Sequence, residues 1–191
     1  MSRKAQITRK TRETEITAGL SPDGGDIRIH TGVGFFDHML YAMAFHAGWG
    51  LTLEAKGDLE VDGHHTVEDA GIVLGQALRE AVGDKAGVER FGSAYVPMDE
   101  ALGFAAADLS GRAYLSYDCA SGEGGAGDYD PALTREFFRA FVVNAGLTLH
   151  VKVTGGNTHH MTEALFKAAG RALRAACRLT GTAVASAKGV L

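Results

Sequence analysis

HMLYAMAFHAG, at residues 38–48, aligns without a gap with EFFRAFVVNAG, at residues 136–146. Both stretches have the apolar spacing of a helix, and both end in Ala-Gly, where a glycine is typical of a helix end. The segment after each stretch contains LTL and then alternates polar and apolar residues, which is the pattern of a β-strand. The alignment therefore predicts one folding unit that is used twice.

The repeat extends in both directions from these stretches. A glycine-bearing turn follows each predicted strand and leads into a long amphipathic helix, TVEDAGIVLGQALREAV at 66–82 and MTEALFKAAGRALRAACRL at 161–179. Strand-like segments precede the first helix of each half, and they lie at 6–20, 26–33, 93–111 and 113–118. Each half is thus expected to run β-β-α-β-α.

Helices with one apolar face need a second layer to cover that face. We therefore predict an α+β fold that arises by internal duplication of the β-β-α-β-α unit, with the helices on one face of each sheet and the two halves packed helix to helix. No linker separates the halves, so residues 1–85 and 86–191 are expected to form a single domain. The glycine-rich loop at 121–131 is expected to be exposed.

Composition narrows the range of partners and compartments. The net charge is −4 and there is no basic tract, which argues against nucleic acid and anionic membranes as partners. No apolar run reaches the roughly 18 residues of a membrane span, and the first ten residues lack the apolar core of a secretory signal. Cys119 and Cys177 form no CxxC pair, as expected in a reducing compartment. We therefore expect a cytoplasmic protein.

The clearest candidate site is a motif, His-His-x-x-Glu, that occurs at the start of each long helix. Four of the eight histidines lie in its two copies. On a helix, positions i and i+4 share one face, whereas adjacent residues are turned by about 100°. Neighbouring histidines can therefore serve two metals, or one metal and an interface. The first copy is His64, His65 and Glu68, and the second is His159, His160 and Glu163.

The aligned helices add one further candidate ligand to each copy. His38 opens the first helix stretch, and its counterpart in the second is Glu136. Imidazole and carboxylate together suit Mn, Zn, Fe or Ni, so eight such donors predict a dinuclear metal site. A single His-His pair is more often a solvated helix start, and a lone Glu is more often a capping partner, but the duplication favours metal. We expect each metal to take its donors from one half of the chain, except that His160 of the second half joins the donors of the first half.

The chain resembles the imidazoleglycerol-phosphate dehydratase family nearly from end to end. The resemblance is carried by RKTRET at 9–14, FFDHML at 35–40, HHTVED at 64–69, RFG at 90–92, PMDEAL at 97–102, DLSGRAYL at 108–115, GLTLHVKV at 146–153, HHMTEALFKA at 159–168 and SAKG at 186–189. It implies a monofunctional hydro-lyase of L-histidine biosynthesis that converts imidazole glycerol phosphate to imidazole acetol phosphate. It also implies two Mn ions per active site and a homo-oligomer of twenty-four chains with sites at subunit interfaces.

The same resemblance assigns roles to single residues. The eight histidine and glutamate positions match the metal ligands, although many members have His where this chain has Glu136. Glu13 matches the acid/base of the family, with Glu15 as a competitor, and taken alone it is an exposed strand residue. Asp99 matches a residue that holds or relays protons, and otherwise it is a turn residue. Lys167 is expected to reach the site, unless it only pairs with Glu163 on the helix surface.

The substrate phosphate needs cations, and four residues near the ends of the second half match the family's contacts. Arg suits bidentate phosphate binding and Lys supplies a point charge. These residues are Arg90, Arg112, Ser186 and Lys188. Each of the three cations alone is more often a surface charge. Two other functions remain open from the residues: a different dinuclear metal hydrolase, which would not need Glu13, and a non-enzymatic metal-binding shell protein, which would not need the phosphate contacts.

Overall fold

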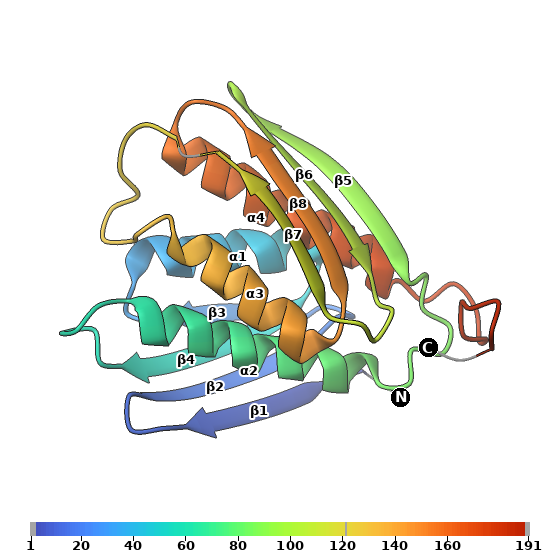
Figure 1. Cartoon of the computed structure of the whole chain (residues 1–191). Coiled ribbons are helices and arrows are strands. Elements are labelled where there is room, and N and C mark those ends of the chain that lie inside the picture. Colours follow the sequence, from blue (N-terminus) through green and yellow to red (C-terminus); the bar gives the residue numbers. More distant parts are fainter. Residues whose placement is uncertain (1–2, 121, 190–191) are drawn as a thin grey trace.

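The computed structural model describes residues 3–120 and 122–189, and its elements fall into two equivalent sets (Figure 1). The first set is β1 (Ala5–Lys10), β2 (Thr14–Ser21), β3 (Ile27–His30), α1 (Gly34–Ala47), β4 (Gly50–Gly57) and α2 (His64–Val82). The second set is β5 (Phe91–Met98), β6 (Ala101–Asp108), β7 (Tyr114–Cys119), α3 (Leu133–Ala145), β8 (Thr148–Thr154) and α4 (Thr158–Cys177). The two sheets have equivalent strand orders, β1-β2-β4-β3 and β5-β6-β8-β7.

The duplicated α+β fold is confirmed, but each half holds one more strand than the sequence predicted. The stretches at 6–20 and 93–111 are each a hairpin rather than one strand, so the unit is β-β-β-α-β-α. In the first hairpin the Thr11 hydroxyl accepts hydrogen bonds from the backbone N–H groups of Glu13 and Thr14. In the second, Asp99 and Glu100 form a two-residue turn, and Asp99 has a φ of 49°. Polar turn residues thus interrupt patterns that alternate on both sides.

The layers run sheet, helices, helices, sheet (Figure 1). In the first half, α2 covers β1 and β2 while α1 lies against β3; in the second, α4 covers β5 and β6 while α3 lies against β7. The halves meet where α2 packs on α3 and α1 packs on α4, so the predicted helix-to-helix packing is confirmed. The centre of this interface is aromatic: Phe137 lies 5.4 Å from both Phe36 and Phe166, measured between ring centroids.

Equivalent glycines allow the two helix pairs to approach closely. A Cβ on Gly75 of α2 would lie 2.5 Å from the carbonyl oxygen of Phe141 on α3. A Cβ on Gly170 of α4 would lie 2.4 Å from the carbonyl oxygen of Met43 on α1. Both distances are far below van der Waals contact with backbone, so neither crossing has room for a side chain.

Gly75→Ala and Gly170→Ala are therefore expected to destabilise the protein, although alanine is the better helix former. Separating two packed helices by overpacking costs about 1–3 kcal/mol, and thermal unfolding should show a lower Tm. Gly34→Ala is the matched control, because nothing lies within 4 Å of a Cβ at that helix position. An unchanged Tm in both crossing variants would show that the helices can shift apart freely.

The helices begin earlier than the sequence pattern suggested, which places the histidine pairs in their first turns. α2 begins at His64 rather than at Thr66, and α4 begins at Thr158 rather than at Met161. The Asn157 side chain caps α4 by accepting a hydrogen bond from the backbone N–H of His160 at 3.1 Å. All four helices start at the same end of the molecule, on the left in Figure 1, so the candidate ligands gather there. None of the described helices is long and apolar enough to cross a membrane.

Candidate active site and metal centre

Three candidate ligands meet where the start of α1 lies beside the start of α4. Nε2 of His38 lies 3.4 Å from Oε2 of Glu163, and Nε2 of His159 lies 3.1 Å from the same oxygen. Among the residues that the structure describes, these form the one group of three potential ligands whose donor atoms all lie within 4.8 Å of one another. We call His38, His159 and Glu163 cluster A. The edge of the Phe35 ring packs against the His159 imidazole, with 5.1 Å between ring centroids.

Glu163 is the buried member of cluster A, and it is ionised. Burial acts to raise the pKa of this carboxyl, but a hydrogen bond to Lys167, the charge of Lys167 and the two imidazoles outweigh it, and the pKa lies below its ordinary value. Lys167 Nζ contacts Oε1 at 2.7 Å, which leaves Oε2 facing the two histidines. The cluster therefore presents one carboxylate oxygen and two imidazole nitrogens toward a common point, a donor set that suits a divalent transition metal.

The equivalent residues of α2 and α3 form a second group, and an arginine contacts both of its carboxylates. His64 Nε2 lies 3.8 Å from Glu68 Oε2. Arg139 bridges the two acids: its Nη2 contacts Glu68 Oε1 at 2.7 Å, and its Nε contacts Glu136 Oε2 at 2.8 Å. These hydrogen bonds, that to Glu136 first, raise the pKa of Arg139 above its ordinary value. We call His64, Glu68 and Glu136 cluster B.

The grouping of donors by half was wrong. Because α1 packs on α4 and α2 packs on α3, each cluster joins one residue of one half to two residues of the other. His38 therefore meets His159 and Glu163 rather than His64, and Glu136 lies on the Glu68 side. His160 does not cross to His38 either, because its ring contacts Glu100.

The second histidine of each pair points away from its cluster. The rings of His64 and His65 lie 83° apart, and those of His159 and His160 lie 81° apart. His65 Nδ1 contacts Asp58 at 3.0 Å and His160 Nδ1 contacts Glu100 at 2.9 Å. These hydrogen bonds are the largest cause of the raised pKa of each imidazole. The bond to His160 also contributes most to the low pKa of Glu100, about 2.

A carboxylate held on Nδ1 fixes the orientation of an imidazole and leaves Nε2 free for another partner. Glu13 and Asp99 lie near these free atoms. Glu13 Oε1 is 3.9 Å from His65 Nε2, and Asp99 Oδ2 is 3.8 Å from His160 Nε2. Both acids lie at hairpin ends beside a candidate ligand. Glu15 instead pairs with Lys10 at 2.6 Å, so of these two acids only Glu13 lies beside a candidate ligand.

Sequence reasoning missed three residues that the structure brings to these groups. Asp58 follows β4 and Glu100 lies in the β5–β6 turn, and the repeat alignment gave no signal for either. Arg139 lies three residues after Glu136 on α3, a spacing that places both side chains on one helix face. That spacing is the one signal in the sequence that could have identified it.

The residues predicted to bind phosphate gather around Asp108. Arg90 Nε contacts Asp108 Oδ1 at 2.7 Å, and Arg112 Nη2 lies 4.0 Å from Oδ2. Arg90 Nη1 also donates to the carbonyl of Ala185 at 2.8 Å, which ties the segment that carries Ser186 and Lys188 to this place. Arg90 has a φ of 74°, and such strained backbone is concentrated at functional sites.

Within one chain, these predicted phosphate-binding residues lie far from clusters A and B. The strand β6 runs from Ala101, beside the turn that contacts His160, to Asp108, beside Arg90. At about 3.3 Å per residue, these ends lie roughly 23 Å apart. In Figure 1 the helices begin at the left of the view, whereas β5 begins at the right.

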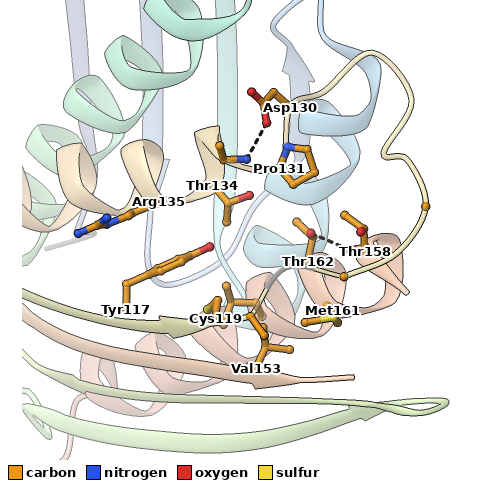
Figure 2. Close-up of a pocket in the computed structure, with 15 residues that line it drawn as sticks. Tyr117, Cys119, Asp130, Pro131, Thr134, Arg135, Val153, Thr158, Met161 and Thr162 are labelled. Atoms are coloured by element: carbon orange, nitrogen blue, oxygen red, sulfur yellow. Dashed lines mark hydrogen bonds between the residues drawn. The ribbon is translucent and has the colours of Figure 1, made fainter. Parts of the chain in front are cut away.

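A cavity of about 610 Å³ lies under the loop between β7 and α3, and none of the predicted site residues lines it (Figure 2). Thr158 and Thr162 of α4 face it, and each is turned by about 100° round the helix from its neighbour in cluster A. Cys119 lines its floor, and burial raises the pKa of this thiol to about 11. The thiol is therefore protonated at neutral pH, so Cys119 is not an activated nucleophile.

Comparisons with known proteins point to one family. The family model for imidazoleglycerol-phosphate dehydratase matches residues 31–173. The imidazoleglycerol-phosphate dehydratase of Acetivibrio thermocellus is 54% identical over all of both chains, and that of Lacticaseibacillus casei is 53% identical over 99% of this chain and all of the relative.

Two solved structures carry the same family name or its abbreviation. The crystal structure of imidazoleglycerol-phosphate dehydratase from Staphylococcus aureus superposes with a TM-score of 0.80 at 46% identity, covering 93% of this chain and 99% of that one. The structure of IGPD from Pyrococcus furiosus superposes with a TM-score of 0.84 at 38% identity, covering 97% of this chain and all of that one. The chain therefore belongs to the imidazoleglycerol-phosphate dehydratase family.

Proposed function

We propose that this chain dehydrates imidazole glycerol phosphate to imidazole acetol phosphate, the hydro-lyase reaction of its family in L-histidine biosynthesis, with two Mn ions per active site. The observation that carries the metal part of this proposal is cluster A, in which donor atoms of His38, His159 and Glu163 all lie within 4.8 Å of one another. A different metal hydrolase is less well supported, because it would not need the predicted phosphate-binding residues around Asp108.

The donor atoms present fit manganese. Cluster A offers two imidazoles and one carboxylate, and cluster B offers one imidazole and two carboxylates; both sets are mixed nitrogen and oxygen ligands of the kind that Mn accepts. His65 and His160 would supply further imidazole donors through Nε2, because carboxylates already hold their Nδ1 atoms. Bound Mn supplies Lewis-acid and templating chemistry toward the substrate imidazole.

The protein's own residues move the protons. The reaction breaks a C–H bond and the adjacent C–O bond, releases water, and gives an enol that tautomerises to the ketone. We assign removal of the carbon-bound proton to the Glu13 carboxylate, which is exposed to substrate beside His65. Asp99 lies in the equivalent position beside His160, where it can hold or relay the proton that the enol needs. Lys167 lowers the pKa of Glu163 and so favours its ionised form.

The phosphate contacts imply that one active site uses more than one chain. Only three carbons separate the imidazole ring of the substrate from its phosphate ester. The metal clusters and the predicted phosphate-binding residues lie at opposite ends of β6, which are roughly 23 Å apart. Arg90, Arg112, Ser186 and Lys188 of one copy must therefore serve the metal clusters of another. This supports a homo-oligomer with sites at its interfaces, and we propose the twenty-four-chain assembly that the family resemblance implies. Two free cysteines, one of them buried, support a reducing cytoplasm.

The test is an assay of the purified protein, stripped of metal and then reloaded with Mn, with imidazole glycerol phosphate as substrate. We expect imidazole acetol phosphate to form with Mn and its formation to stop when a chelator is added. Full activity in rigorously metal-free protein would remove the metal from the proposal. Absence of product from Mn-loaded, correctly folded protein would remove the reaction itself.

A further inference from the structure

We propose that Arg139 is a built-in counter-ion that holds the second metal site before the metal arrives, so that the two Mn ions bind in order, cluster A first and cluster B second. The inference rests on the proposed function, because it takes both clusters to be metal sites. The two clusters should differ in their affinity for Mn, although the sequence repeat makes them look alike.

The contacts of Arg139 define this role. Its guanidinium forms one hydrogen bond of 2.7 Å to Glu68 and one of 2.8 Å to Glu136, from two different nitrogens. It therefore pairs with both carboxylates of cluster B at once and places one positive charge against their two negative charges. A metal that takes Glu68 Oε1 or Glu136 Oε2 must displace Arg139, and one that takes Glu68 Oε2, which faces His64, must bind close to its positive charge. The Arg139 side chain is 53% exposed, so it has room to turn into solvent.

Cluster A has no such cation between its donors. In the gapless alignment of the two helices, Tyr41 of α1 takes the position of Arg139. Tyr41 stacks on Phe45, with 6.4 Å between ring centroids, and carries no charge. Lys167 binds Oε1 of Glu163 and leaves Oε2 open to His38 and His159. No cation therefore comes between Glu163 Oε2 and the two imidazoles among the described residues.

The different donor charges explain why only cluster B has a cation that bridges two carboxylates. Cluster A has one carboxylate, whereas cluster B has two, because Glu136 takes the place of His38. Two ionised carboxylates that face one site repel each other unless a cation lies between them. Arg139 supplies that cation in the metal-free chain, and Mn supplies it in the loaded one. Metal binding at cluster B is consequently an exchange of one cation for another, which weakens its apparent affinity.

The experiment is a Mn titration of the metal-free, full-length protein by equilibrium dialysis, with no substrate present. The wild type should show two affinity classes. Arg139→Gln removes the competing charge but keeps much of the side chain, and it should tighten the weaker class by about ten- to a hundred-fold, the equivalent of one charge-assisted hydrogen bond. The tight class should stay within about twofold of wild type.

Matched variants assign the classes. His38→Ala should remove the tight class and Glu136→Gln the weak one. Arg135→Gln is the control: the residue lies one turn earlier on α3, and among the described residues no acidic side chain pairs with it, so both classes should stay unchanged. If Arg139→Gln lowers the yield of folded protein, Arg139→Lys replaces it. The single ammonium of lysine cannot reproduce both hydrogen bonds of the guanidinium, so this variant should also tighten the weak class.

Two results would overturn the inference. Weaker or unchanged binding in the weak class of Arg139→Gln would make Arg139 a support for the site rather than a competitor. A single affinity class in the wild type would make the clusters equivalent. Failure of the wild type to bind any Mn is a different result, because it would refute the proposed metal dependence itself.

Discussion

Glu163→Gln is expected to lose the metal of cluster A and to lower kcat by about a thousandfold. Glu163 Oε2 is the atom that both His38 and His159 approach, so no other residue of the cluster can replace it. A metal that acts as Lewis acid contributes several kcal/mol to the barrier, and each 1.36 kcal/mol is tenfold in rate. Metal analysis by mass spectrometry and a steady-state assay on the same sample measure both effects.

Glutamine keeps the size of the side chain, so loss of fold is not the expected cause. Glu80→Gln is the control, since Glu80 is exposed near the end of α2, far from the helix starts. It should retain both metals and full activity, and both variants should unfold cooperatively. A Glu163→Gln variant with two tightly bound Mn ions and normal kcat would exclude Glu163 as a ligand.

Much of this fold follows from the repeat alone. The apolar period of 38–48 and 136–146, with a glycine after each, predicts two helices, and the LTL segments after them predict strands. The extra strand of each half was missed because the hairpin turns at Thr11 and at Asp99 interrupt long alternating segments with only two or three polar residues. Such short turns leave the period of two nearly intact.

The composition of the clusters could not be read from the sequence. Helical period shows which side chains share a face, so it correctly separated His64 from His65 and His159 from His160. It does not show which helix packs on which. An arrangement of α1 on α2 would bury similar apolar faces, and only the three-dimensional packing places α1 on α4. The distance between Arg112 and the metal ligands also depends on three-dimensional packing, so the sequence does not predict it.

The central claim is that one active site takes cluster A from one chain and its phosphate contacts from another. Two inactive variants test it. Glu163→Gln lacks a metal ligand, and the double variant Arg112→Ala, Lys188→Ala lacks two phosphate contacts. Arg112 is 74% exposed and Lys188 lies in the exposed final segment, so both changes should spare the fold. Each charge-assisted contact is worth about 1.5–3 kcal/mol, so the double variant should lose roughly a hundredfold or more in kcat/KM.

The decisive measurement is the dehydratase activity of mixed oligomers, made by co-expressing the two variants with different tags and purifying on both tags in turn. If sites lie between chains, some combine intact metal ligands from the double variant with intact phosphate contacts from Glu163→Gln. With random assortment in equal amounts, activity should recover to as much as about a quarter of wild type. If each chain holds a complete site, every site in the mixture carries one defect. Activity no higher than that of the two parent variants would contradict the account.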